Sequence, residues 1–309
     1  MTTAASLKGI FSPVLTPFNP DCTPDPVRYQ RHCRWLLEQD VGLAIFGTNS
    51  EANSLSVAEK RRLLGALLEA GLPAERMMPG TGACAVPDAI ELTRAAVEAG
   101  CGGVLMLPPF YYKGVSEEGL YRAFASVIDA VADERLRIYL YHIPPVSQVP
   151  ITRGLIARLL KAYPRAIAGM KDSSGDWNNT KAMLEEFAPQ GFDVFAGSEN
   201  FLLRNLRGGG AGCITATGNV NAGAIVQLYQ TWQGSEADAQ QARLDATRAV
   251  FAQFPMIPAM KAAIAWKSGH DAWRTVRPPL VELDAQQQQA LQAALDKVGF
   301  AMPNAASLA

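Results

Sequence analysis

Eight short β-rich runs alternate with amphipathic helical patterns along the chain, and this alternation limits the possible folds more than any other feature. The runs start roughly 20 to 35 residues apart, which is the length that a strand, a loop and a covering helix occupy in a βαβ unit. They cover residues 9–15, 43–47, 77–81, 103–107, 137–143, 166–171, 193–197 and 211–215. The alternation predicts an α/β protein with a parallel sheet.

Eight such units favour a closed (β/α)8 TIM barrel over an open, doubly wound sheet. The first run is not followed by the G-x-G-x-x-G motif with which many doubly wound sheets bind a dinucleotide. After the eighth run the pattern is helical only. We therefore predict a barrel over residues 1–232 and a C-terminal helical extension over residues 233–309, packed on the barrel because no linker rich in Pro, Gly or Ser separates them.

The composition of the chain indicates which kinds of partner it binds and in which compartment it works. The 309 residues carry 28 Lys and Arg against 29 Asp and Glu, a net charge of -1, and this balance does not favour nucleic acid. Neither a signal peptide nor a membrane-spanning apolar stretch is apparent. The five cysteines lack C-x-x-C or metal-ligand spacing, as expected for reduced core thiols. We expect a cytoplasmic protein with no metal, no nucleic acid and no membrane partner.

The run over residues 166–171 ends in Lys171 and then breaks into polar turn residues. A short apolar run of this kind is typical of a buried parallel strand that ends at a loop face. Lys171 is therefore expected to be buried, with Gly169 on the same face leaving open space beside it. Apolar surroundings favour the neutral amine, which attacks a carbonyl to form a Schiff base. The ordinary alternative is a lysine that snorkels or forms an ion pair at a strand end.

Other polar residues follow the strand ends, where parallel barrels carry their catalytic groups. Thr48 follows the second run, Tyr112 follows the fourth, and Tyr141 lies near the end of the fifth. A phenol at Tyr141, on the strand before Lys171, is suited to pass a proton to or from a forming imine. Taken singly, Thr48, Tyr112 and Tyr141 fit a loop threonine, a surface aromatic and a core tyrosine better than a catalytic set, and only their joint order favours catalysis. His142 alternates away from Tyr141 and is expected to pack under a helix.

Four segments at these strand ends resemble motifs of the dihydrodipicolinate synthase / N-acetylneuraminate lyase family, in the same order. Residues 47–51 (GTNSE) resemble its G-[TS]-[TS]-G-E loop, and residues 109–112 (PFYY) its P-x-Y-Y segment. Residues 141–144 (YHIP) resemble Y-N-x-P, and residues 169–176 (GMKDSSGD) resemble G-x-K-[DE]-[STA]-[ST]-G-[DN]. The resemblance covers nearly the whole chain and extends to residues 277–280 (RPPL).

The resemblance implies a class I lyase or aldolase that needs no cofactor and no metal. Lys171 would form a Schiff base with a 2-oxo acid, usually pyruvate, and the protonated imine would stabilise an enamine that adds to an aldehyde or is released from one. By the family pattern, Tyr141, Thr48 and Tyr112 form a proton relay, and Tyr112 comes from a neighbouring subunit of a homotetramer built as a dimer of dimers. Thr48 and Asn49 are expected to hold the carboxylate.

The segment after Tyr141 departs from the family pattern. Dihydrodipicolinate synthases have an arginine there that binds the carboxylate of aspartate semialdehyde, but Val146 takes that place in this chain and lacks the bidentate contacts of a guanidinium. We therefore expect a 2-oxo-3-deoxy acid as the substrate. The expected second-substrate pocket comprises Pro145, Val146, Ser173, Gly197, Ser198, Glu199 and Asn219, and Ile214 is also expected to bind substrate. Ser198 and Glu199 equally fit the N-terminus of a helix.

Three other functions stay open. The first is a 4-hydroxy-tetrahydrodipicolinate (dihydrodipicolinate) synthase that uses pyruvate and aspartate semialdehyde, with an arginine such as Arg153 supplied from elsewhere. The second is a dehydratase or deaminase acting on a related 2-oxo acid through the same imine. The third is a non-catalytic sensor barrel that binds an oxo acid, although a sensor does not need a proton-transfer group beside its lysine.

Overall fold

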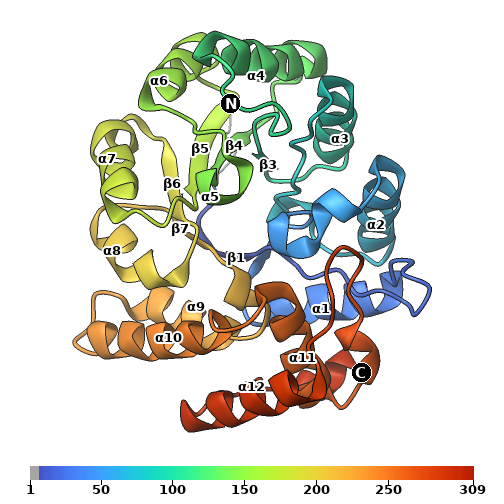
Figure 1. Ribbon diagram of the computed structural model, residues 1–309. Helices are drawn as coiled ribbons and strands as arrows, with labels where there is room; N and C mark the ends of the chain where they lie inside the picture. The colour runs from blue at the N-terminus through green and yellow to red at the C-terminus, as the bar shows by residue number, and fades with distance from the viewer. Residues whose placement is uncertain (1–6) are drawn as a thin grey trace. The chain divides into compact units, whose positions relative to one another are not determined.

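The computed structural model describes residues 7–309, and its parallel strands with covering helices give the α/β class that the sequence predicts (Figure 1). The chain divides into two compact units. The first unit comprises Met1–Gly9, described from residue 7, and Pro73–Ile214. The second unit comprises Ile10–Leu72 and Thr215–Ala309. The predicted division between residues 232 and 233 stays a prediction.

The described residues form seven strands, twelve α-helices and eight 3-10 helices. The strands are β1 (Gly9–Ser12), β2 (Gly42–Leu43), β3 (Val104–Met106), β4 (Ile138–His142), β5 (Ile167–Asp172), β6 (Asp193–Ala196) and β7 (Gly212–Ile214). The α-helices are α1 (Pro26–Glu38), α2 (Val57–Glu69), α3 (Val86–Glu98), α4 (Glu117–Val131), α5 (Pro144–Ser147), α6 (Arg153–Ala162), α7 (Trp177–Phe187), α8 (Leu202–Arg207), α9 (Ala222–Thr231), α10 (Ala237–Phe251), α11 (Met256–Ser268) and α12 (Ala285–Lys297). The 3-10 helices are η1 (Thr48–Ser50), η2 (Ala52–Ser54), η3 (Ala74–Arg76), η4 (Ala188–Gln190), η5 (Glu199–Phe201), η6 (Ala216–Asn219), η7 (Asp271–Arg274) and η8 (Ala305–Leu308).

In the first unit, β3 to β7 pair in parallel, each strand with the next along the chain. The register places Leu140, Met170 and Val194 in one row, and all three belong to the core formed with α3, α4, α6 and α7. Figure 1 shows these helices along the outer side of the strands. Side chains one residue further along therefore point to the opposite face of the sheet, because strand side chains alternate.

One predicted strand, over residues 77–81, is wrong. The backbone there makes an isolated bridge between Gly80 and Leu105, with Leu105 N–H donating to Pro79 O at 2.8 Å and Thr81 N–H donating to Leu105 O at 3.0 Å, and Gly102 N–H donates to Met77 O at 3.1 Å without forming a strand. Pro79 has no N–H to extend the ladder. The segment nevertheless packs closely, since a Cβ at Gly82 would lie 2.3 Å from the backbone nitrogen of Leu107.

In the second unit, β1 and β2 pair in parallel, with Phe11 opposite Gly42. Glycine is required at position 42 because a Cβ there would lie 2.4 Å from the Phe11 ring. The helices of this unit include α10, α11 and α12, which occupy the part of the chain that the sequence predicts to be helical.

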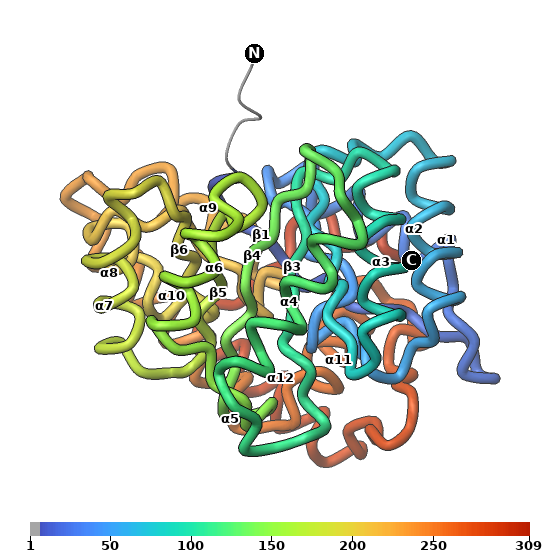
Figure 2. Tube along the Cα trace, turned by 90° about the horizontal axis from the view of Figure 1, so that it is seen from above, coloured from blue at the N-terminus to red at the C-terminus, as the bar shows by residue number. Residues whose placement is uncertain are grey.

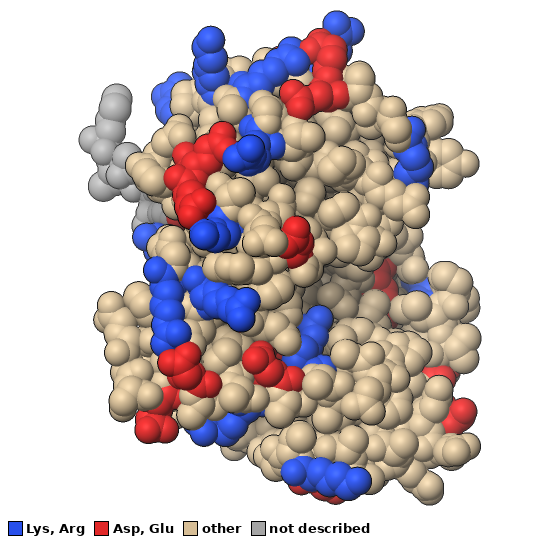
Figure 3. All heavy atoms as spheres, turned by 60° about the vertical axis from the view of Figure 1, so that its left-hand side comes forward, with Lys and Arg blue, Asp and Glu red and all other residues tan. Residues whose placement is uncertain are grey.

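The hydropathy of the helices and the distribution of surface charge fit the balanced composition of the sequence. Among residues 7–309, no single helix is both long and apolar enough to cross a membrane; α10 and α11 satisfy that length and composition criterion only together, as a pair bent by 104°. On the face drawn in Figure 3, basic and acidic side chains are interspersed in small groups. This face therefore carries no extended field of one sign.

Asn205 on α8 links two strands of the first unit. Its Nδ2 donates to the carbonyls of Val194 on β6 at 3.0 Å and Gly212 on β7 at 2.9 Å, and the residue is fully buried. A Cβ at Gly210 would lie 2.2 Å from this amide, so the turn after α8 closes directly over it. Helix α8 in turn lies beside α7 (Figure 2).

Substituting Asn205 tests this linkage. Asn205→Ala should lower the free energy of unfolding by about 2 kcal/mol, because two buried carbonyls lose their donor. Asn205→Asp should lower it further at pH 7, by about 3 kcal/mol or more, because an ionised carboxylate would face two carbonyls. Burial would raise the folded-state pKa of Asp at this position, so its stability should be greatest below about pH 4 and fall as pH rises through the raised pKa. Urea unfolding at both pH values measures this, and equal losses for the two variants at pH 7 would contradict the linkage.

Candidate active site

Lys171 lies near the C-terminal end of β5, between β4 and β6. The parallel register places it opposite Tyr141 on β4 and Phe195 on β6, and only 2% of the lysine is exposed. The prediction that Lys171 is buried on a strand is confirmed. The apolar sequence of β5 explains the burial, since a strand with neighbours on both sides in a parallel sheet is covered on both faces.

Tyr141 is the polar partner of this lysine. Lys171 Nζ donates to Tyr141 Oη at 3.2 Å and lies 4.3 Å from the centre of the tyrosine ring. Among residues 7–309, no carboxylate forms an ion pair with Lys171. A structural lysine that is buried is normally paired with an acid. The ordinary explanation of Lys171 as an ion-paired or snorkelling lysine therefore does not fit.

The expected open space beside Lys171 at Gly169 is wrong. A Cβ at Gly169 would lie 2.2 Å from the carbonyl oxygen of Asp193 and 2.9 Å from the ring of Tyr139. The glycine thus permits close approach of neighbouring groups rather than leaving a gap, which sequence alternation alone does not reveal.

The opposite face of β5 anchors the strand end. The Asp172 carboxylate accepts hydrogen bonds from Ser174 N–H at 2.9 Å, Asn179 Nδ2 at 2.9 Å and Thr180 Oγ1 at 2.7 Å. These donors come from the following loop and from α7, so Asp172 ties both to the residue after Lys171. The sequence analysis does not include Asn179 or Thr180. The available signal is Asp172 itself, because a buried acid directly after the lysine needs hydrogen-bond donors nearby.

His142 lies next to Asp172 on this outer face and is not part of the Lys171 face. Its Nδ1 accepts from Ile151 N–H at 3.0 Å, in the segment that leads into α6, and the side chain is buried. Burial lowers the pKa of His142, while the neighbouring Asp172 acts in the opposite direction. The prediction that His142 points away from Tyr141 and packs inside is confirmed.

Two predicted substrate-binding residues, Ser173 and Gly197, contact each other. Ser173 N–H donates to His142 O and Gly197 N–H donates to Asp172 O, both at 2.7 Å. A Cβ at Gly197 would lie 2.0 Å from Ser173 Oγ. The loops after β5 and β6 are therefore joined at a position that excludes a larger side chain.

Ser198 and Glu199 occupy the start of η5. Ser198 Oγ accepts from Asn200 N–H at 3.4 Å and donates to Asn200 Oδ1 at 3.0 Å, which confirms that Ser198 caps this turn. Glu199 is buried, with 1% of its surface exposed. Their role in substrate binding stays a prediction, as does that of Ile214, which is fully buried at the end of β7.

Tyr112 and Val146 are exposed. Tyr112 is 72% exposed and packs edge to face with Tyr111 at 5.3 Å, while Val146 on α5 is 62% exposed. Lys113, which was not predicted, joins their two segments by donating to Phe110 O and, at 2.8 Å, to Ser147 O.

Thr48 and Asn49 belong to the second unit and form η1 with Ser50. Ser50 Oγ accepts from Gly47 N–H at 3.0 Å, and Ser50 O accepts from Thr16 Oγ1 at 2.7 Å. In the same unit, the fully buried Asn219 donates to the carbonyls of Pro13 and Ala216 and accepts from Leu15 N–H. These contacts show that Asn219 supports backbone turns, and its expected place in a substrate pocket stays a prediction.

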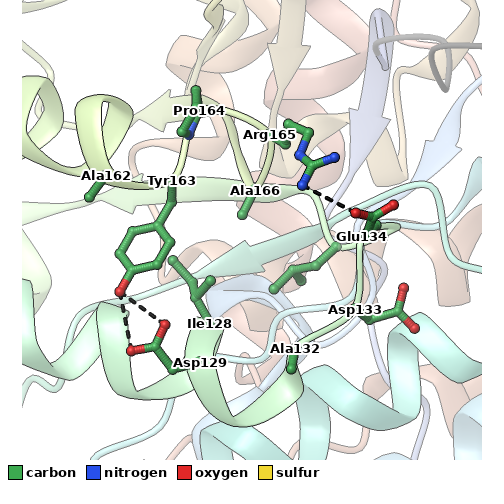
Figure 4. A pocket seen from close by; sticks show the side chains of 11 residues that line it. Ile128, Asp129, Ala132, Asp133, Glu134, Ala162, Tyr163, Pro164, Arg165 and Ala166 are labelled. Atoms are coloured by element: carbon green, nitrogen blue, oxygen red, sulfur yellow. Dashed lines mark hydrogen bonds and ion pairs between the residues drawn. The ribbon is translucent and has the colours of Figure 1, made fainter.

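A separate cavity of about 480 Å³ lies at the other end of β4 and β5, where residues 136 and 166 line it (Figure 4). Two of its acids have partners in the lining: Tyr163 Oη donates to Asp129 at 3.0 Å, and Arg165 pairs with Glu134 at 3.1 Å. Within residues 7–309, no group of three His, Cys, Asp or Glu side chains is placed to hold a metal ion.

Comparison with known proteins identifies a family for this chain. The model of the dihydrodipicolinate synthetase family matches residues 6–298. An uncharacterized DapA-like lyase from Chloroflexus aurantiacus is 37% identical over 300 residues, covering 95% of this chain and 98% of the relative.

Solved structures give the same result. Dihydrodipicolinate synthase from Agrobacterium tumefaciens has 30% identity and a TM-score of 0.85, over 94% of this chain and 99% of that chain. A prophage protein of the dihydrodipicolinic acid synthase family from E. coli K12, solved in complex with pyruvate, has 26% identity and a TM-score of 0.87, over 96% of this chain and all of that chain. The resemblance inferred from four motifs is confirmed: the chain belongs to the dihydrodipicolinate synthetase family and is a lyase of that family.

Proposed function

We propose that the protein is a class I lyase that condenses pyruvate, or another 2-oxo acid, with an aldehyde or releases it, and that it acts on a 2-oxo-3-deoxy acid. The observation that carries this proposal is the buried Lys171, whose polar partner is the phenol of Tyr141 at 3.2 Å. A nucleophilic amine beside a proton-transfer group is what imine chemistry needs.

The reaction begins when the neutral amine of Lys171 adds to the C2 carbonyl of the 2-oxo acid. The carbinolamine then loses water: Tyr141 Oη delivers a proton to the departing hydroxyl, and the nitrogen lone pair forms the iminium. The deprotonated Tyr141 oxygen takes a proton from C3 to give the enamine, whose carbon attacks the aldehyde, and Tyr141 then returns that proton to the aldehyde oxygen. Hydrolysis of the new iminium frees the product and the lysine. Cleavage follows the same steps in reverse.

The remaining roles follow the family pattern. Thr48 and Asn49 hold the carboxylate of the 2-oxo acid, and Thr48 continues the proton relay from Tyr141. Ser173, Gly197, Ser198, Glu199 and Ile214 frame the second substrate together with Val146.

Two observations support a hydroxylated second substrate rather than aspartate semialdehyde. Val146 replaces the carboxylate-binding arginine. Arg153, the candidate replacement, forms an ion pair with Glu186 at 3.0 Å, with 59% of its own side chain exposed. The Glu186 carboxylate therefore competes with a substrate carboxylate for the guanidinium of Arg153.

Dihydrodipicolinate synthase is the second candidate function, because the Agrobacterium enzyme of that name is 30% identical over nearly the whole chain. It requires a carboxylate-binding group other than a residue at position 146.

For the fold, we propose a closed (β/α)8 barrel followed by a C-terminal helical extension over residues 233–309, supported by the two solved relatives above, each of which covers at least 94% of the chain. A crystal structure with an open sheet would contradict this. A cytoplasmic location is supported by five free cysteines, and recovery of the protein outside the cytoplasm by cell fractionation would argue against it.

Borohydride reduction with pyruvate tests the chemistry. Intact mass and peptide mapping should find one reduced adduct on Lys171, and none in Lys171→Met, which keeps an unbranched side chain but has no amine. Lys181, which is exposed on α7, provides the matched control: Lys181→Met should label normally. No adduct with pyruvate or with longer 2-oxo acids would favour a binding protein without catalysis.

Borohydride reduction, together with a turnover assay, also tests the role of Tyr141. Tyr141→Phe keeps the ring under the lysine but removes the hydroxyl, so turnover should fall by about 10²- to 10⁴-fold, the usual contribution of a general acid or base. Slow adduct formation should persist. Unchanged turnover would remove Tyr141 from the proton transfer.

An aldehyde competition separates the two candidate substrates. With pyruvate at saturation, hydroxylated aldehydes should react with a kcat/KM at least about tenfold above that of aspartate semialdehyde, because Val146 makes no ionic contact with a carboxylate. The reverse preference would establish dihydrodipicolinate synthase activity. If both partners fail while the adduct forms, release of water or ammonia from a related 2-oxo acid is the next reaction to assay.

Assembly is proposed as a homotetramer, a dimer of dimers in which Tyr112 enters the neighbouring subunit. The exposed pair Tyr111 and Tyr112 supports this, since large aromatic side chains are enriched at interfaces. Sedimentation should give four times the mass of the 33.2 kDa chain. Tyr112→Phe should keep that mass and lower turnover; a fully active monomer would contradict the proposal.

A further inference from the structure

Lys261 on α11 is a second buried lysine, and the proposed function does not use it. Its side chain is fully buried, and Nζ donates to Glu51 Oε1 at 2.5 Å and to Thr275 O at 2.8 Å. The ammonium also lies 4.5 Å from the centre of the Phe18 ring. Glu51 is equally buried, so the pair is shielded from water on all sides.

Glu51 is held at both carboxylate oxygens. Oε2 accepts from the backbone N–H of Arg277 at 2.8 Å, in the segment that follows η7. The guanidinium of Arg277 is itself fixed by Glu59 at 2.8 Å and by the carbonyls of Cys22 and Ser54. The hydrogen bonds from Arg277 are the main reason that the pKa of Glu59 falls to about 2. The groups that grip Glu51 are therefore themselves anchored.

The backbone at Glu51 ends the turn that carries Thr48 and Asn49. Glu51 N–H donates to Thr48 O at 3.2 Å, and Ser50 N–H donates to Gly47 O at 3.0 Å. Glu51 has a φ of +56°, a left-handed conformation that is uncommon for a residue with a side chain. The segment after η7 contacts the short turns that follow β2, since Arg277 donates to Glu51 from its backbone and to the carbonyl of Ser54 on η2 from its side chain. The carboxylate contacts thus hold a backbone conformation that the residue would not otherwise prefer.

Stability alone does not explain this pair. Burial lowers the pKa of Lys261 to about 8 even though the Glu51 carboxylate favours the charged form. Buried ion pairs are often no more stabilising than apolar residues of the same volume, but they impose a defined geometry when fully hydrogen-bonded. The arrangement therefore points to a positional role.

We propose that Lys261 is a positioning residue: from α11 it fixes Glu51 and, through Glu51, the turn that carries Thr48 and Asn49. The inference rests on the proposed function, which assigns the carboxylate of the 2-oxo acid to that turn. It predicts that the C-terminal helices take part in substrate affinity without touching the substrate.

The experiment uses the full chain and three variants. Lys261→Met removes the charge but leaves Glu51 buried and unpaired, which threatens folding. The double variant Glu51→Gln, Lys261→Met removes both charges and keeps the side-chain volumes, so it tests the role in a folded protein. Lys267→Met makes the same substitution on the same helix at a partly exposed lysine that lies over Trp266, and it is the matched control.

Two readouts are compared with the wild type. The pyruvate concentration for half-maximal trapping on Lys171 should rise about tenfold or more in the double variant, since small misplacements of binding groups have large effects. The maximal extent of labelling should stay unchanged. Amide exchange at Ser50, Glu51 and Ala52 should become about tenfold faster while exchange along β5 stays the same. Lys267→Met should alter neither.

Each outcome decides a different point. A wild type that forms no adduct overturns the proposed function, and the exchange rates then still decide whether Lys261 fixes the turn. An unchanged half-saturation together with unchanged exchange in the folded double variant overturns the positioning role. A loss of maximal labelling in proportion to unfolded protein, at constant half-saturation, assigns Lys261 to stability alone and also overturns it.

Discussion

The proposed chemistry depends on a buried amine, that of Lys171, whose polar partner is a phenol where a carboxylate would be expected. The described residues contain both ways of burying a lysine, and they differ in one respect. Lys261 contacts the carboxylate of Glu51, which favours its charged form, whereas the polar contact of Lys171 is with the hydroxyl of Tyr141, whose ring it also approaches. A carboxylate beside Lys171 would hold the proton on the amine and suppress attack on a carbonyl. The register that pairs Lys171 with Tyr141 is therefore the arrangement on which the proposed site depends.

Much of this arrangement could be predicted from local sequence. The apolar run before Lys171 and the polar break after it predict a buried strand, and strand alternation separates Tyr141 from His142 correctly. The strand expected at residues 77–81 failed because Pro79 limits pairing to one bridge. There the missing N–H of Pro79 outweighed a pattern of apolar residues that favours a strand.

What could not be predicted involves contacts between distant parts of the chain. The space at Gly169 is filled by Asp193 and Tyr139, and the amide of Asn219 is occupied by backbone groups. Composition and periodicity report how often a residue type is buried, but they do not report which atom approaches it. The partnership of Glu51 with Lys261 spans 210 residues and has no local signature.

The two faces of β5 have a consequence for how the amine moves. Lys171 extends from a strand that is hydrogen-bonded on both sides, and the next residue, Asp172, accepts three hydrogen bonds on the other face. Its backbone therefore cannot shift without disrupting the sheet, and only the side-chain torsions remain free to sample positions. In the proposed reaction, much of the orientational entropy that Lys171 would lose on meeting the carbonyl is already lost on folding, so it does not add to the barrier of each turnover.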